Sequence, residues 1–351
     1  MEQLRRKTIK ILAVVLMILV AAGTLGYYFV FTKQDNNLDI ADDGFLNNRV
    51  SFLLIGADKR PQDPGFNADS IIMASVDPQS KIISMLSIPR DTRVRLSEDN
   101  FVKMNSVPML ESTSVLMDKV TELTGVPLQG YIMTNFNGFK SIIDTLGGID
   151  LYVEKDMYYE TGDNEDGYIN LKQGEQRLNG EQALQYARFR HDALADISRT
   201  ARQQKVLRAV ADQLLQVKTI TRLPALIAQF KAAVETNLSL TDLLRMAKAA
   251  AAFDSSNIVA QTLPGAFLDY DGISYWEVNP EQTKITVQNL FLGITSDKVI
   301  DNEVIDLLDP GIKAHIKVPG NPQDPNSKKS PSYQDFLKNY PLPSATERKN
   351  D

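Results

Sequence analysis

Four arginines and a glutamine lie close together in the sequence: Arg188, Arg190, Arg199, Arg202 and Gln203. A guanidinium group binds phosphate through two parallel hydrogen bonds, and several together stabilise charge that develops on phosphoryl oxygens. Arg199, Arg202 and Gln203 are three or four positions apart in a predicted helix, so we expect them to share one face. Arg188 and Arg190 are two apart in a predicted extended segment, which also gives them a common face. The cluster predicts a phosphate site, and a solvated basic face balanced by nearby aspartates is the alternative.

A second group of polar residues is expected at one rim of a sheet. Apolar runs predict three strands, at 50–56, 70–77 and 81–89. A turn sequence joins the last two as a hairpin. If the first two are also antiparallel, Asp58, Asp69 and Arg90 meet at the same end. Two aspartates there suit Mg²⁺, which prefers oxygen ligands and often completes its shell with substrate phosphate. From spacing alone, solvated loop aspartates are the favoured interpretation.

Composition excludes several other kinds of chemistry. The 351 residues include no cysteine and two histidines, so disulfides, thiol nucleophiles and thiolate zinc sites are excluded and histidine sites are poorly supported. A formal net charge of -6 argues against a protein that coats nucleic acid. The sequence also lacks a Walker-type phosphate loop, a dinucleotide-binding glycine motif and a hydrolase nucleophile elbow.

The N-terminal segment predicts a membrane anchor. Residues 11–31 form an uncharged apolar run, long enough for a helix to span about 30 Å of hydrocarbon. Basic residues precede the run, within residues 1–10, whereas acidic residues follow it. The positive-inside rule therefore places the N-terminus in the cytoplasm. A cleaved signal peptide and a buried helix are the alternatives. The sequence therefore predicts a single-pass protein of the cell membrane whose folded domain is extracellular.

The remainder predicts one domain between a tether and a tail. Residues 32–48 are polar and form the tether, and residues 308–351 are rich in proline and polar residues, which is typical of a flexible tail. Between them, strand-like and helix-like patterns alternate over 49–307 and predict an α/β fold, a central mixed β-sheet flanked by helices in three layers. The expected helices lie at 114–125, 136–148, 178–192 and 200–217, with a further strand at 149–154.

Five segments carry a recognisable pattern: LLIGADKR (53–60), ADSIIMASVDPQSKIISMLSIPRDT (68–92), NFNGFKSIIDTLGGIDLYV (135–153), LNGEQALQYARFRHD (178–192) and DISRTARQQKVL (196–207). In their order and spacing, over roughly residues 50–210, the sequence resembles the LytR–CpsA–Psr family of bacterial cell-wall enzymes. It implies a Mg²⁺-dependent phosphotransferase that moves an anionic glycopolymer, such as wall teichoic acid or capsular polysaccharide, from an undecaprenyl-pyrophosphate carrier to peptidoglycan.

The resemblance also implies roles for individual residues. Asp58 and Asp69 are similar to the metal-binding aspartates of the family. The pyrophosphate-binding set is implied to be Arg90, Arg188, Arg190, Arg199 and Gln203, with Arg60, Asp196 and Arg202 as supporting members. Of these, Arg90, Arg188, Arg190 and Asp196 are expected to be catalytic. The sequence departs from the family pattern at 67–69 and after 103–108, and neither departure touches the proposed metal and phosphate residues. Both weaken any assignment of the polymer that is carried.

Two other functions are compatible with the same residues. A prenyl-pyrophosphate hydrolase would use water in place of the peptidoglycan acceptor. A non-catalytic protein that binds prenyl-phosphate lipids or acts as a regulator would need the arginines for binding alone. The sequence names neither the base that accepts the acceptor proton, for which Asp58, Asp69 and Asp196 are candidates, nor the residues that line a groove for the prenyl chain.

Overall fold

A computed structural model describes residues 49–59, 65–98, 100–160, 167–190, 195–214, 233–239, 242, 258–296, 298–301, 303–306 and 308. The predicted anchor and tether, and all but the first residue of the predicted tail, lie outside these ranges, so their structure stays a prediction. Among the described residues, no helix combines the length and the apolar character needed to cross a membrane.

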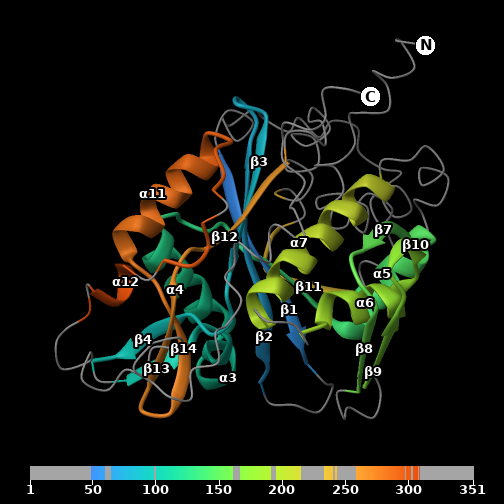
Figure 1. Ribbon diagram of the computed structural model, residues 1–351. Helices are drawn as coiled ribbons and strands as arrows, with labels where there is room; N and C mark the ends of the chain where they lie inside the picture. Colours follow the sequence, from blue (N-terminus) through green and yellow to red (C-terminus); the bar gives the residue numbers. More distant parts are fainter. Residues whose placement is uncertain are drawn as a thin grey trace.

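A six-stranded mixed sheet forms the centre of the domain (Figure 1). Its order is β11 (Val234–Thr236), β6 (Tyr131–Asn135), β1 (Val50–Asp58), β2 (Asn67–Asp77), β3 (Ile82–Ile88) and β12 (Ile258–Thr262). The pair β2–β3 is antiparallel, as the sequence predicted, and β1–β2 is antiparallel too, which meets the condition set for the rim. In contrast, β6 joins β1 and β12 joins β3 in parallel. The long central strands are buried on both faces, because helices cover the sheet on each side.

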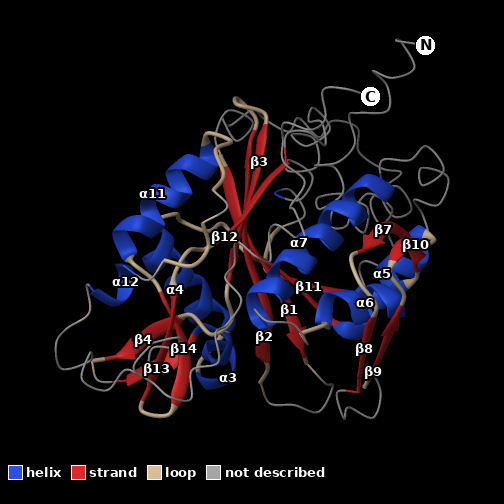
Figure 2. Cartoon of the chain, in the orientation of Figure 1, coloured by secondary structure: helices blue, strands red, loops and turns tan. Residues whose placement is uncertain are grey.

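Helices pack on both faces of this sheet, which confirms the predicted central mixed sheet flanked by helices (Figures 1 and 2). On one face, Phe52, Leu54 and Ile72 pack in a core with residues of α5 (Phe136–Leu146), α6 (Gly180–Arg188) and α7 (Ala195–Leu214). On the other, Leu53, Ile55 and Ile71 pack with residues of α4 (Thr113–Thr124) and α11 (Pro280–Phe291). Successive strand residues thus alternate between two cores.

Local sequence signals set the ends of the helices. Asn179 caps α6 through a capping box with Gln182, whose side chain accepts from the Asn179 backbone N–H. Gly147 ends α5 at a φ of 81°, in the left-handed region that glycine adopts without strain. The helix α7 begins at Ala195, five residues before the predicted start at 200. The prediction began too late because the first turn is polar and adds nothing to the apolar stripe on which it was based.

Short hairpins flank the central layers. One group comprises β4 (Arg93–Ser97) with β5 (Asn100–Lys103) and β13 (Ala266–Tyr270) with β14 (Ile273–Glu277), beside α3 (Val107–Leu110) and α12 (Glu303–Asp306). A second group comprises β7 (Ile149–Val153) with β10 (Gly174–Leu178) and β8 (Met157–Glu160) with β9 (Tyr168–Leu171). Figure 1 shows the first group at the lower left and the second at the right, beside α5 and α6. Of these strands, only β7 was predicted.

Candidate active site

The ends of β2 and β3 bring Asp69 and Arg90 together at one rim of the central sheet. Arg90 Nη1 donates to Asp69 Oδ1 at 2.9 Å, so the predicted meeting of these two residues is confirmed. Asp58 is the last residue of β1 and lies opposite Asn67 in the antiparallel register, two residues from Asp69 along β2. Its side chain lies outside the described residues.

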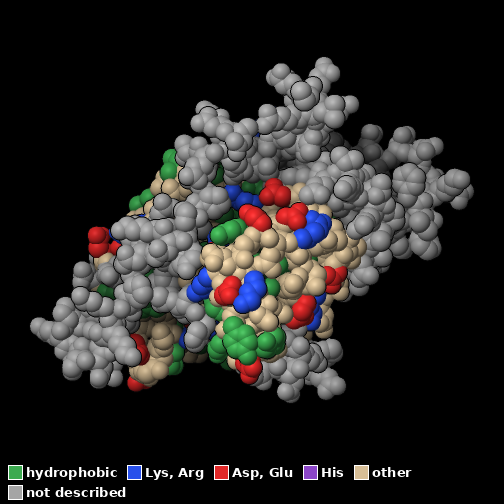
Figure 3. Space-filling view, turned by 45° about the vertical axis from the view of Figure 1, so that its right-hand side comes forward, with side chains coloured by type: hydrophobic (Ala, Val, Ile, Leu, Met, Phe, Trp, Pro, Cys, Tyr) green, Lys and Arg blue, Asp and Glu red, His purple; other side chains and the backbone are tan. Residues whose placement is uncertain are grey.

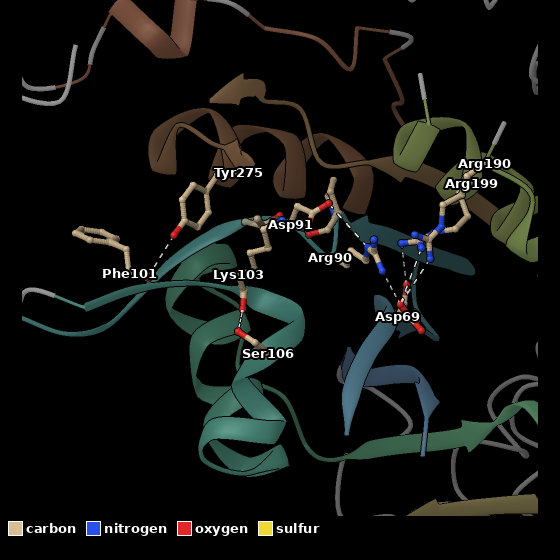
Figure 4. Close-up of polar contacts among 11 residues, drawn as sticks. Asp69, Arg90, Asp91, Phe101, Lys103, Ser106, Arg190, Arg199 and Tyr275 are labelled. Atoms are coloured by element: carbon tan, nitrogen blue, oxygen red, sulfur yellow. Dashed lines mark hydrogen bonds and ion pairs between the residues drawn. The ribbon is translucent and has the colours of Figure 1, made fainter. Parts of the chain in front are cut away.

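Two further arginines approach the same carboxylate from other parts of the chain (Figure 4). Arg190 Nη2 and Arg199 Nη1 each lie 4.0 Å from Asp69 Oδ1, and Arg199 Nη2 donates to the Asp69 backbone carbonyl at 3.2 Å. The Arg199 side chain is only 3% exposed, whereas that of Arg190 is 40% exposed. Three guanidinium groups thus face the Asp69 carboxylate, and Arg90 Nε also lies 3.8 Å from Asp91 Oδ2. Three arginines against these two carboxylates make the rim attractive to an anion.

Arg188 and Arg190 line the same cavity, although no strand carries them. Arg188 is the last residue of α6, and Phe189 leaves the helical path with φ −60° and ψ 128°. The Arg188 guanidinium lies 4.7 Å from the centre of the Phe136 ring, a cation–π contact that fixes it at the cavity wall. The predicted common orientation of the two arginines is therefore present, but the end of a helix produces it.

The expectation that Arg199, Arg202 and Gln203 share one face is wrong for Arg202. Arg199 and Gln203 line the cavity, whereas the Arg202 side chain is 1% exposed and donates from Nε to Glu154 Oε1 at 2.7 Å. On a helix, a residue three positions along is rotated about 60° from the first and one four positions along about 40° the opposite way. That rotation turns Arg202 toward Glu154 at the end of β7, so its guanidinium does not line the cavity.

A buried carboxylate that sequence reasoning missed lies behind the arginines. Glu154 follows β7 and accepts hydrogen bonds from Arg202 and from the hydroxyl of Tyr186. Burial alone would raise the pKa of Glu154, but the charges of Arg202 and Lys205 and the Tyr186 hydrogen bond outweigh burial and hold that pKa below its ordinary value. The carboxylate is therefore ionised at neutral pH. Neither a motif nor a spacing pattern marks Glu154 in the sequence.

A single cavity of about 660 Å³ extends from this rim into the layer between the sheet and α5, α6 and α7. Its polar end contains the residues Asn67, Asp69, Ser70, Arg90, Asn105, Arg188, Arg190, Arg199 and Gln203. Its apolar walls include Leu54, Ile72 and Ile132 from the sheet, Phe139, Ile142 and Ile143 from α5, Leu184 and Ala187 from α6, and Val206, Leu207 and Val210 from α7. The volume falls within the range of about 300–1,000 Å³ typical of ligand pockets.

A metal at the rim would find few protein ligands. Asp69 is the only carboxylate among the described residues that line the cavity, and the described part of the chain holds no group of three or more metal-ligating side chains. The side chains of Asp58 and Asp196, and all of Arg60, lie outside the described residues. This donor set fits Mg²⁺ rather than a metal that needs a full protein cage, because Mg²⁺ commonly keeps waters and uses substrate phosphate oxygens.

Comparison with known proteins places the chain in a family. The model of the LytR_cpsA_psr family matches residues 32–291. The chain belongs to this family. It is 30% identical over 308 residues to the polyisoprenyl-teichoic acid–peptidoglycan teichoic acid transferase TagV of Bacillus subtilis, covering 82% of this chain and 79% of that protein. It is also 32% identical over 204 residues to the regulatory protein MsrR of Staphylococcus aureus, covering 58% of this chain and 59% of MsrR.

The fold of the LytR_cpsA_psr family agrees with that described above. The crystal structure of B. subtilis TagV matches 71% of this chain and 99% of that chain, with a TM-score of 0.59 and 30% sequence identity. The resemblance found in the sequence is thereby confirmed at the level of family and fold, and the match includes every element that forms the arginine-lined rim.

Proposed function

We propose that this chain is a Mg²⁺-dependent transferase that moves an anionic glycopolymer, of the wall teichoic acid or capsular polysaccharide type, from an undecaprenyl-pyrophosphate carrier to peptidoglycan. The observation that carries this proposal is the division of one cavity into an arginine-lined mouth and apolar walls. A ligand complementary to both parts has an anionic head group and a hydrocarbon chain. The name of TagV, which pairs a polyisoprenyl-linked polymer with peptidoglycan, supports the same donor and acceptor.

The charges at the mouth suit a pyrophosphate. Arg90, Arg190 and Arg199 lie around Asp69, and Arg188 adds a fourth guanidinium at the cavity wall. Arg90 Nε also lies 3.8 Å from Asp91 Oδ2, so these four arginines outnumber the two carboxylates named beside them. A pyrophosphate diester would bring two negative charges to this excess of positive charge. Guanidinium–phosphate hydrogen bonds are charge-assisted and worth roughly 1.5–3 kcal/mol each, which suffices to orient the phosphorus that is attacked.

The apolar walls suit a prenyl chain. Ile132, Ile142 and Val206 face the cavity from the sheet, α5 and α7, so a chain that enters from the mouth passes between the layers of the domain. Each buried methylene contributes about 0.8 kcal/mol, and a prenyl unit with five carbons therefore contributes up to about 4 kcal/mol. A soluble nucleotide would leave these walls unused, which argues for a lipid donor.

The reaction exchanges a phosphoanhydride bond for a phosphodiester bond. A hydroxyl oxygen of peptidoglycan attacks the phosphorus that bears the glycopolymer, a new phosphodiester bond forms, and the anhydride bond to the prenyl phosphate breaks. Undecaprenyl phosphate leaves, and the hydroxyl proton passes to a carboxylate, for which Asp58, Asp69 and Asp196 are the candidates. Arg90, Arg188, Arg190 and Arg199 hold the phosphates and stabilise the charge that develops on their oxygens. Bound Mg²⁺, held by Asp58 and Asp69, would supply further charge neutralisation there.

The proposed topology matches the donor. We include in the proposal the helix predicted at residues 11–31, with the N-terminus in the cytoplasm and the domain outside. A short tether at 32–48 would then keep the arginine-lined mouth near the membrane surface in which a prenyl-linked polymer is embedded. Peptidoglycan lies on the same side of the membrane.

Product analysis tests the proposal against its alternatives. The purified chain is incubated with a labelled lipid-linked polymer and Mg²⁺, with and without peptidoglycan. A transferase releases prenyl phosphate and moves the label to peptidoglycan only when peptidoglycan is present. Equal release of prenyl phosphate in both reactions would indicate a hydrolase, and no turnover with intact lipid binding would indicate the binding or regulatory role that the name of MsrR suggests.

A further inference from the structure

We propose that Glu154 is a positioning residue for the phosphate-binding arginines, acting through Arg202 and the Phe189 backbone. The proposal rests on the proposed function, because it concerns how the same mouth binds pyrophosphate. Glu154 does not line the cavity. Its side chain is 5% exposed, and a carboxylate is rarely buried to this extent unless it is paired.

Glu154 joins three elements at one point. Arg202 of α7 donates from Nε to Oε1 at 2.7 Å, and Tyr186 of α6 donates its hydroxyl to Oε2 at 2.7 Å. Lys205, one turn further along α7, places its Nζ 3.9 Å from Oε2. Glu154 itself directly follows β7. The carboxylate therefore fixes α6 and α7 to each other and to the strand behind them.

Arg202 carries this link to the segment that holds two of the site arginines. Its Nη1 donates to the backbone carbonyl of Phe189 at 3.0 Å, and its guanidinium lies 5.1 Å from the centre of the Phe189 ring. Phe189 is the residue at which the chain leaves α6, between Arg188 and Arg190. By holding this carbonyl in place, Arg202 determines the direction in which the chain, and with it Arg190, leaves the helix.

The same arginine is adjacent to the second half of the mouth. On α7, Arg202 lies three residues after Arg199 and one before Gln203, and both of these line the cavity. A change in the rotation of α7 about its axis would move all three together. Glu154 pairs with Arg202 at 2.7 Å, so loss of its charge would loosen both arginine-bearing segments at once.

The desolvation cost of burying the Glu154–Arg202 ion pair points to positioning rather than to stability alone. Buried ion pairs contribute little net stability compared with apolar packing, since desolvation offsets much of their attraction, whereas a fixed geometry is what they provide best. Preorganised donors stabilise phosphoryl charge only when they are held close to their working positions. Glu154, acting through Arg202 on the segments that carry Arg190 and Arg199, supplies that constraint.

The test separates head-group binding from binding of the tail. Titration calorimetry of the full chain in detergent measures the affinities for geranylgeranyl pyrophosphate and for geranylgeraniol, the alcohol with the same hydrocarbon chain. For Glu154→Gln, which keeps the size of the side chain and removes its charge, we expect the affinity for the pyrophosphate to fall about tenfold, the equivalent of one charge-assisted hydrogen bond. The affinity for the alcohol stays within about twofold of that of the unaltered chain.

Two further variants complete the design. Asp77→Asn breaks an ion pair with Arg49 at the other end of β2, roughly 25 Å along the strand from Asp69, and should change neither affinity. Tyr186→Phe removes only the contact to Glu154 Oε2 and gives a smaller loss of the same selectivity. It takes the place of Glu154→Gln if that variant does not fold, as judged by circular dichroism.

The outcomes are distinct. A loss of affinity confined to the pyrophosphate supports positioning. The Glu154→Gln change should cause a smaller loss when it is made in an Arg190→Ala chain, because both changes act through Arg190. Equal losses for both ligands, or none for either, would overturn the proposal while leaving the proposed function intact. If the unaltered chain binds the pyrophosphate no better than the alcohol, the proposed function itself fails, and the positioning role fails with it.

Discussion

Replacing Arg190 with alanine should weaken pyrophosphate binding at little cost to the fold. The Arg190 side chain is 40% exposed, and its ion pair with Asp69 is long, at 4.0 Å. Exposed ion pairs contribute about 0.2–1 kcal/mol, so we expect the free energy of unfolding to fall by no more than about 1 kcal/mol. One charge-assisted hydrogen bond to phosphate is worth roughly 1.5–3 kcal/mol, which raises the dissociation constant about 10- to 150-fold.

The two quantities are measured separately. Urea denaturation gives the free energy of unfolding, and titration calorimetry with geranylgeranyl pyrophosphate gives the dissociation constant. Arg177→Ala is the matched control, because Arg177 is similarly exposed, at 44%, pairs with Asp150 at 2.7 Å, and does not line the cavity. It should leave the dissociation constant unchanged. An Arg190→Ala chain that bound the pyrophosphate as tightly as the control would refute the assignment of Arg190 to the phosphate site.

Three other predictions follow from the cavity, the metal and the buried carboxylate. Val206→Phe should fill part of the apolar wall and weaken binding of geranylgeranyl pyrophosphate at least tenfold by calorimetry, with inorganic pyrophosphate unaffected. Chelation of divalent cations should stop polymer transfer, and Mg²⁺ should restore it, while circular dichroism shows an unchanged fold. The pKa of Glu154 is lowered in the folded chain, so this carboxylate contributes stability above pH 4.5, its ordinary pKa. That contribution is lost as the pH falls below 4.5 toward the lowered pKa. Urea denaturation at a series of pH values should show the loss, and Glu154→Gln should make the free energy of unfolding less dependent on pH in this range.

The rim of the sheet could be predicted because strand direction alone fixes it. The antiparallel β2–β3 pairing places the start of β2 and the end of β3 at the same end, so Asp69 and Arg90 had to meet once the hairpin was recognised. The arginines of α6 and α7 were predicted from residue type, since a dense cluster of guanidinium groups needs anions or carboxylates nearby. Residue type alone left a phosphate site and a solvated basic face both open for them.

What depended on packing could not be predicted. Ile142 and Val206 are buried apolar residues whether they line a cavity or fill a core, so the sequence did not reveal the cavity. The direction of Arg202 depended on how α7 is rotated against β7, because positions three or four apart on a helix differ by only tens of degrees in direction. Glu154 ends an ordinary strand pattern, and only the approach of α6 and α7 turns it into a buried partner for both.

The most direct measurement is a structure of the chain with geranylgeranyl pyrophosphate and Mg²⁺. We predict that the two phosphates lie at the mouth shown in Figure 4, within hydrogen-bond distance of Arg90, Arg190 and Arg199, and that the hydrocarbon chain runs between the sheet and α5 to α7. Figure 3 shows Lys and Arg side chains interspersed with Asp and Glu on the face that it presents, so surface charges outside the mouth are the alternative location for an anion. Phosphates bound there, or a cavity left empty by the prenyl chain, would contradict the proposed donor site.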